Sequence, residues 1–100
     1  MNIVYQTQNS NTPSIASATT ALSSNSARRG WYIQNLGQNA LFVRCGTGAS
    51  SSVFHFVLKA ASANDDGTGG SVGQTDGCVF TGEISIAGSS PRYTILEMAP

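Results

Sequence analysis

Charged side chains are scarce in this chain. Asp, Glu, Lys and Arg make up 10% of its 100 residues, whereas about 25% is usual for a soluble domain. The five basic and five acidic residues cancel to a net charge of zero. A nucleic-acid-binding protein needs a basic stripe to neutralise phosphates, and the sequence has none. We therefore expect no nucleic-acid partner, and the low net charge favours association with other subunits.

Cysteines and long apolar runs are also in short supply. The two cysteines, Cys45 and Cys78, are too few for a disulfide scaffold. Two reduced, buried thiols and a Cys45–Cys78 bridge both fit their strand-like surroundings. No run reaches the ~20 apolar residues of a membrane helix, and the first residues lack the basic and apolar regions of a signal peptide. These absences predict no membrane association and synthesis in a reducing cytoplasm.

Residues that could carry chemistry are few. His55 is the only histidine, and its neighbours do not have the spacing of a zinc site or a nucleophilic triad. Asp65, Asp66 and Asp76 lie in a glycine-rich segment that could gather around calcium, but the alternate acids and final bidentate Glu of an EF-hand loop are missing. We expect no catalytic residue, no cofactor and no metal, and hence no enzyme.

Apolar and polar side chains alternate along much of the chain, which is typical of β-strands. Residues 53–59 are apolar on both faces, which predicts a central strand covered by a neighbour, and residues 60–77 form a long glycine-rich loop. Residues 15–22 are ambiguous: their Ala content permits a helix, but the Thr pair and polar flanks favour an extended segment. The other predicted strands are Asn2–Gln6, Gly30–Asn35, Ala40–Cys45, Cys78–Gly82, Glu83–Ala87 and Arg92–Met98.

Short strands separated by glycine-rich turns indicate an all-β fold. We predict a small antiparallel β-sandwich, jelly-roll or Ig-like, of about 6–8 strands. Residues 1–27 carry no charged side chain and are rich in Ser, Thr, Asn and Ala. They are predicted to form an extended N-terminal arm that could contribute a strand, and residues 28–100 form the sandwich. Such a small body usually gains stability from disulfides, metal or association with other chains.

The candidate interface residues come from the arm, the start of the sandwich and the glycine-rich loop. Arg28 and Arg29 are either a solvated strand entry or a clamp on the Asp65–Asp66 loop of another copy, since the planar fork of Arg grips carboxylates. Trp31 is expected in the core, whereas Tyr32 is a candidate for an interface. The predicted interface residues are Ile3, Tyr5, Arg28, Arg29, Tyr32, Asp65 and Asp66.

Several segments resemble the small virion structural proteins of tailed bacteriophages. They are Arg-Arg-Gly-Trp-Tyr-Ile-Gln-Asn-Leu-Gly at residues 28–37, Ala-Leu-Phe-Val-Arg-Cys-Gly at 40–46, Thr-Gly-Glu-Ile-Ser-Ile-Ala-Gly at 81–88 and Tyr-Thr-Ile-Leu-Glu at 93–97. The resemblance implies a β-sandwich that decorates or cements the capsid, commonly as a trimer or another homo-oligomer. It also implies assembly in the host cytoplasm, a place in the virion, and the major capsid protein or other virion subunits as partners.

A second function fits the same sequence. A tail or fibre tip, or a carbohydrate-binding adhesion module, would use exposed aromatic side chains framed by the glycine-rich loop. The candidates for such a platform are Tyr32, Phe42 and Tyr93.

Overall fold

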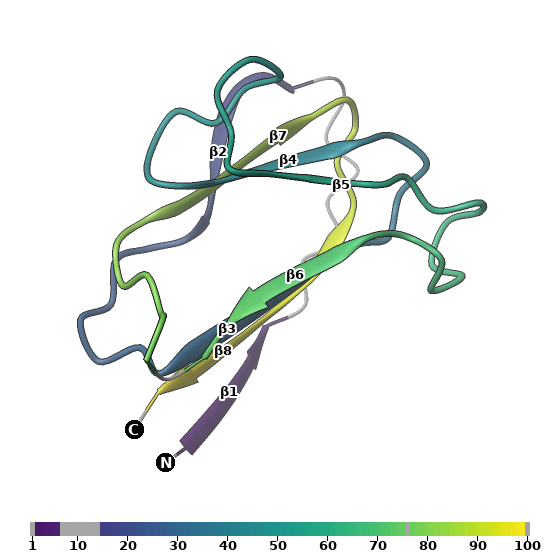
Figure 1. The fold of residues 1–100 in the computed structure, drawn as a ribbon. Helices are drawn as coiled ribbons and strands as arrows, with labels where there is room; N and C mark the ends of the chain where they lie inside the picture. Colours follow the sequence, from purple (N-terminus) through teal and green to yellow (C-terminus); the bar gives the residue numbers. More distant parts are fainter. Residues whose placement is uncertain (1, 7–14, 76, 100) are drawn as a thin grey trace.

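The chain folds into two stacked antiparallel β-sheets. The structure, a computed structural model, describes residues 2–6, 15–75 and 77–99, with side chains from residue 20 onward, and these residues contain eight strands and no helix. Figure 1 shows the two sheets facing each other, as in a β-sandwich. The strands are β1 (Asn2–Gln6), β2 (Ile15–Leu22), β3 (Gly30–Asn35), β4 (Leu41–Cys45), β5 (Phe56–Leu58), β6 (Ser71–Gln74), β7 (Ile84–Gly88) and β8 (Tyr93–Ala99).

The strand order follows a simple rule. The first sheet has the order β1-β8-β3-β6 and the second has the order β2-β7-β4-β5. In both, strands of the first half of the chain pair with strands of the second half in reverse order: β1 with β8, β2 with β7, β3 with β6 and β4 with β5. The β3–β8 and β4–β7 pairs then join these ribbons into sheets. The result is one long antiparallel ribbon folded over on itself.

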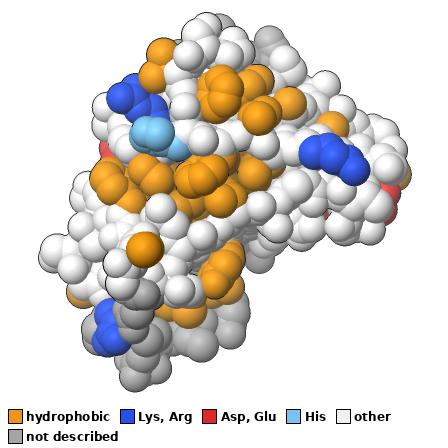
Figure 2. All heavy atoms as spheres, in the orientation of Figure 1, with side chains coloured by type: hydrophobic (Ala, Val, Ile, Leu, Met, Phe, Trp, Pro, Cys, Tyr) orange, Lys and Arg blue, Asp and Glu red, His pale blue; other side chains and the backbone are white. Residues whose placement is uncertain are grey.

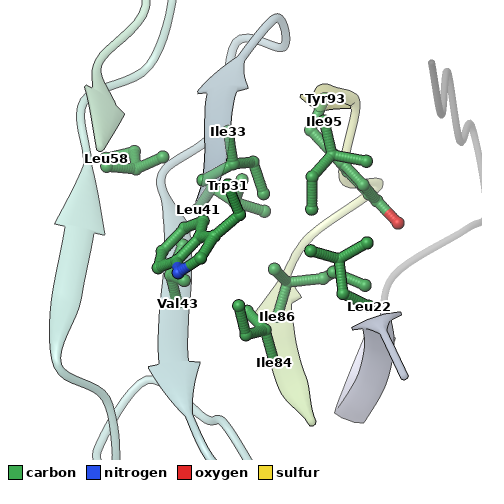
Figure 3. Close-up of a cluster of buried hydrophobic side chains, with 11 residues drawn as sticks. Leu22, Trp31, Ile33, Leu41, Val43, Leu58, Ile84, Ile86, Tyr93 and Ile95 are labelled. Atoms are coloured by element: carbon green, nitrogen blue, oxygen red, sulfur yellow. The ribbon is translucent and has the colours of Figure 1, made fainter. Parts of the chain in front are cut away.

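The core lies between the two sheets (Figure 3). Trp31 is fully buried, as the sequence predicts, and its Nε1–H donates to Oε1 of Gln74 at 2.9 Å. The same oxygen accepts the backbone N–H of Phe80 at 2.9 Å, so the indole and the segment after β6 share one partner. Tyr93 is also buried, and burial raises the pKa of its phenol. The other large core side chains are Leu22, Ile33, Leu41, Val43, Leu58, Ile84, Ile86 and Ile95.

The predicted strands at Asn2–Gln6 and Gly30–Asn35 are confirmed, and residues 15–22 form a strand rather than a helix. Strand β4 begins one residue later than predicted, and β7 and β8 each begin and end one residue later than predicted. The long loop predicted over residues 60–77 is interrupted by β6, which the sequence analysis missed. The central position predicted for residues 53–59 is wrong, because only Phe56–Leu58 is a strand and β5 lies at the edge of its sheet.

The strand predicted at Cys78–Gly82 is absent for a specific reason. Three of its backbone groups bond to side chains, and others bond to the backbone of Asn25 and Thr75, instead of to a neighbouring strand. The N–H of Phe80 donates to Gln74, and the carbonyls of Phe80 and Gly82 both accept from Nη1 of Arg28 at 2.9 Å. These bonds hold the segment as an irregular connection between β6 and β7.

The predicted arm supplies the edge strands β1 and β2. The β1 backbone pairs with β8, with Ile3 opposite Met98 and Tyr5 opposite Leu96, and β2 pairs with β7. The side chains of Ile3 and Tyr5, and all of residues 7–14, lie outside the described residues. The division into an arm, 1–27, and a sandwich domain, 28–100, remains a prediction.

Candidate functional site

The outer face of the second sheet carries exposed apolar side chains. Val53, Phe54 and Val57 have exposed fractions of 44%, 40% and 52%, and half-buried Phe42 lies with them. The rings of Phe42 and Phe54 are tilted at 51° to each other, with centroids 5.1 Å apart. Phe42 also pairs directly with Val57 across β4 and β5. We call Phe42, Val53, Phe54 and Val57 the outer patch.

The loop after β4 explains why the outer patch is at the surface. This loop folds back over the outer face of β7, where the buried hydroxyl of Ser85 accepts the N–H of Ala49 at 3.1 Å and donates to the carbonyl of Gly46 at 2.6 Å. A tight turn follows, in which the N–H of Ser50 donates to the carbonyl of Val53 at 2.9 Å. The chain after this turn brings the ring of Phe54 beside Phe42, and no described strand lies beyond β5 in the sheet.

A shallow groove of about 370 Å³ adjoins the outer patch, and Phe42 belongs to both. Its walls are small and mostly polar, so it suits one inserted side chain rather than a large rigid ligand. The residues that line it are Asn39, Ala40, Phe42, Ser50, Ser51, Ala87, Gly88 and Ser89.

Basic side chains flank the outer patch. By strand alternation Arg44 shares the outer face with Phe42. His55 and Lys59 lie just outside β5, each two residues from Val57, and both are exposed. Nδ1 of His55 accepts the backbone N–H of Cys45 at 3.0 Å, so any proton on the neutral ring is on Nε2. Among the described residues, neither Arg44 nor Lys59 has an ion-pair partner. Figure 2 shows the side of the molecule that carries His55, with Lys or Arg side chains at both ends of an apolar area and Asp or Glu only at the margins.

Arg28 lies in the interior and not on the surface, which corrects both readings of the sequence. Its exposed fraction is 2%, and its Nε donates to Oε2 of Glu97 at 2.8 Å. Nη2 donates to the carbonyl of Ser23 at 2.6 Å, and Nη1 donates to the two carbonyls of the segment before β7. Its side chain is therefore neither a solvated strand entry nor available to clamp another copy. The neighbouring Arg29 is exposed, as an interface residue requires.

The Asp65–Asp66 loop is also bound within its own chain. Arg92 grips Asp65 with two hydrogen bonds, from Nε to Oδ1 at 2.8 Å and from Nη2 to Oδ2 at 2.5 Å. Asp66 accepts from the hydroxyl of Thr68 at 2.6 Å and from the backbone N–H groups of Thr68 and Ala63, each at 2.9 Å. These carboxylates organise their loop, and Asp76 lies outside the described residues.

The free energy of unfolding at acidic pH should depend on the carboxylates of this loop. Hydrogen bonds from Arg92 and Thr68 hold the pKa values of Asp65 and Asp66 below their usual value of 3.8. A lowered folded-state pKa stabilises the fold above the unfolded value, and the contribution is lost as the pH falls through the folded pKa. We therefore expect the free energy of unfolding to fall more steeply below about pH 4 in the natural protein than in an Asp65→Asn, Asp66→Asn double variant. Urea unfolding between about pH 7 and pH 2 measures this, and parallel curves would contradict it.

Tyr32 is exposed at 44%, as its predicted interface role requires, but it lies on the other sheet from the outer patch. Its ring lies over Gly73, its cross-strand partner, where a Cβ atom would collide with the ring. A recess of about 400 Å³ lies beside it, lined also by Gln34, Thr94 and Leu96. Tyr93, the third aromatic candidate for a sugar platform, is unsuitable because it is in the core.

A third recess, of about 550 Å³, brings together Cys45, Cys78 and His55. Both cysteines are free: Cys45 is half-buried and Cys78 is exposed rather than buried as expected. Burial raises the pKa of the Cys45 thiol, which opposes formation of a reactive thiolate. Within residues 2–6, 15–75 and 77–99, no group of three or more His, Cys, Asp or Glu side chains could hold a metal ion.

No protein-family model, curated protein or solved structure matches this chain. In the described part of the chain, no helix is long and apolar enough to span a membrane.

Proposed function

We propose that this chain is a non-enzymatic structural protein of a virion, a decoration or cement protein that stabilises a phage head through contacts between subunits. The observation that carries this proposal is the outer patch. The sandwich buries its own core between the sheets and still leaves Val53, Phe54 and Val57 outside. Contiguous apolar side chains on a soluble domain mark interaction surfaces. The sequence resemblance to small virion proteins of tailed phages supports the same function.

The strand order supports a jelly roll rather than an Ig-like fold. A jelly roll has eight strands in two sheets, and viral capsid proteins and lectins use it. The pairing of β1 with β8, β2 with β7, β3 with β6 and β4 with β5 fits a ribbon wound in this way. A shared fold is support by analogy only, since one fold hosts many functions.

In this proposal the protein works as a homo-oligomer, a trimer by preference, bound to the major capsid protein or to other virion subunits. Residues 1–27 are the arm that ties it to its neighbours. Both described strands of the arm lie at sheet edges, where backbone hydrogen bonds to another chain can replace those made within one chain. Removing residues 1–27 would also take buried Ala21 and Leu22 from the core, so the arm is better tested in the full-length chain.

The alternative, a tail, fibre or carbohydrate-binding adhesion module, is favoured by the recess beside Tyr32. An exposed aromatic ring flanked by the amide of Gln34 and the hydroxyls of Ser71 and Thr94 has the mix of groups that polar ligands such as sugars use. Binding on a glycan array that is lost in Tyr32→Ala but kept in Phe54→Ser would favour this alternative.

The direct test of the virion proposal is the composition of purified particles. We expect quantitative mass spectrometry of virions made from the genome that encodes this chain to find a fixed number of copies of it per particle. That number should be a multiple of the number of subunits in its oligomer. The oligomer mass comes from light scattering of the purified full-length protein. Complete absence from purified particles, with the protein present in the infected cell, would overturn the proposal.

A further inference from the structure

We infer that the outer patch binds an extended acidic segment of a different protein, in which a large apolar residue lies midway between two carboxylates. The inference rests on the proposed function and adds the chemistry of the partner. It follows from three observations: this face has an apolar centre, it has a basic side chain toward each end, and the chain's own sequence has no two acidic residues four positions apart to complement them.

The centre of the site is apolar and has room for one side chain. Phe42 and Phe54 offer tilted rings 5.1 Å apart, and Val57 covers the strand beside them. The groove of about 370 Å³ opens next to Phe42. An aromatic or large aliphatic side chain of the partner can contact both rings, and such anchors contribute most of the affinity in protein interfaces.

The spacing of the basic side chains sets the spacing of the carboxylates. Phe42 and Val57 are opposite each other, Arg44 lies two residues beyond Phe42, and Lys59 lies two residues beyond Val57 in the opposite direction. With the path of β5 continued by one residue to Lys59, Arg44 and Lys59 are about 14 Å apart along the strand direction, at ~3.4 Å per residue. An extended peptide covers this distance in about four residues, and its middle residue faces the same side as both ends. The matching pattern is Glu, any residue, apolar residue, any residue, Glu.

A second copy of this chain does not supply that pattern. Each acidic side chain whose position is described already accepts a hydrogen bond within its own chain, and two of them are in ion pairs. The acids concerned are Asp65, Asp66, Glu83 and Glu97. No two of the five acidic residues in the sequence are four positions apart, so a second copy cannot present this pattern from one extended segment.

The same features favour a polypeptide over a membrane. An anionic membrane attracts a basic surface by about 1 kcal/mol for each Lys or Arg near it, which is little for a site with Arg44 and Lys59 alone. The groove beside the patch has walls of Ser and Asn, which suit a peptide backbone better than acyl chains. Binding to lipid vesicles is therefore the competing outcome of the test.

The test uses the full-length protein and designed probes. The first probe is a short peptide with Phe midway between two Glu residues four positions apart, and the matched probe has Lys in place of both Glu residues. We expect the acidic peptide to bind with a dissociation constant of about 0.1 mM and the basic peptide at least tenfold more weakly. Calorimetry or fluorescence anisotropy measures both, and vesicles of phosphatidylcholine and phosphatidylserine test the membrane.

Surface variants locate the site. Phe54→Ser should lower the affinity for the acidic peptide at least tenfold. Tyr32 is a similarly exposed aromatic residue on the other sheet, and Tyr32→Ser should not change this affinity. The Arg44→Glu, Lys59→Glu double variant should reverse the preference and bind the basic peptide. Equal affinity for both peptides, no binding below about 1 mM, or binding to vesicles alone would each overturn the inference. The particle composition test is independent, so virion association without an acidic preference would refute only this inference.

Discussion

Replacing Glu97 by Ala is expected to lower the free energy of unfolding by about 3–5 kcal/mol, because it leaves a buried arginine without its counter-charge. The side chain of Arg28 has an exposed fraction of 0% and that of Glu97 12%, so both charges are largely shielded from water. A domain of this size has a total stability of about 5–15 kcal/mol, of which the loss would be a large part. Urea unfolding at neutral pH, followed by tryptophan fluorescence, measures the change.

The matched control is Glu83→Ala. Glu83 accepts a hydrogen bond from the hydroxyl of Thr20 in an exposed position, and its loss should cost less than about 1 kcal/mol. Arg28→Lys separates charge from geometry, because an ammonium group keeps the charge but cannot reach Glu97 and three separate carbonyls at once. We expect it to cost about 2–3 kcal/mol. Similar stabilities for the Glu97 and Glu83 variants would show that the buried pair has no special role.

The second large effect is expected at Asn35, a buried amide with an exposed fraction of 1%. Its Nδ2 donates to the carbonyls of Asn39, Leu58 and Lys59 at 2.8, 3.2 and 3.2 Å, and its Oδ1 accepts the N–H of Gly37 at 2.9 Å. One side chain thus holds the β3–β4 turn and the end of β5. Asn35→Ala should cost about 3–4 kcal/mol, because the carbonyls of Asn39 and Leu58 and the N–H of Gly37 lose this partner at ~1–3 kcal/mol each. The carbonyl of Lys59 keeps the N–H of Gly70.

Two further variants sharpen that prediction. Gln38→Ala is the control, since Gln38 is exposed and donates a single long hydrogen bond to the carbonyl of Ser62; it should change stability by less than about 0.5 kcal/mol. Asn35→Asp keeps the shape but points a carboxylate at three carbonyls, so it should be more destabilising at neutral pH than at low pH, where the protonated acid can donate. An Asn35→Ala variant as stable as Gln38→Ala would contradict the proposed role.

Local alternation predicted much of the fold. In β3, Trp31 and Ile33 alternate with polar or exposed neighbours, and the strand is where the pattern places it. The alternation of apolar and polar residues did not predict β6, because Gly73 interrupts the pattern. A Cβ atom at this position would collide with the ring of Tyr32, which is distant in the sequence. Alternation also failed at Cys78–Gly82, where side chains of Gln74 and Arg28 take the place of a neighbouring strand.

The candidate site was harder to predict, and for a physical reason. Apolar residues on both faces of 53–59 look the same whether a neighbour covers the outer face or nothing does. The sequence predicts a covered strand, but Val57 is more than half exposed in the structure. For this reason the outer patch could not be predicted from the sequence. Arg28 posed the opposite problem: its partner Glu97 is 69 residues away, so nothing near Arg28 in the sequence indicates that its charge is buried.

The pairing of β1 with β8 has a practical consequence for protein engineering. Asn2 is the cross-strand partner of Ala99, so the two ends of the described fold lie side by side at the same end of the first sheet (Figure 1). The outer patch is on the second sheet. A reporter fused to either end would therefore emerge from one common position away from the patch, and a short linker between the ends should permit a circularly permuted molecule with new termini in a surface turn.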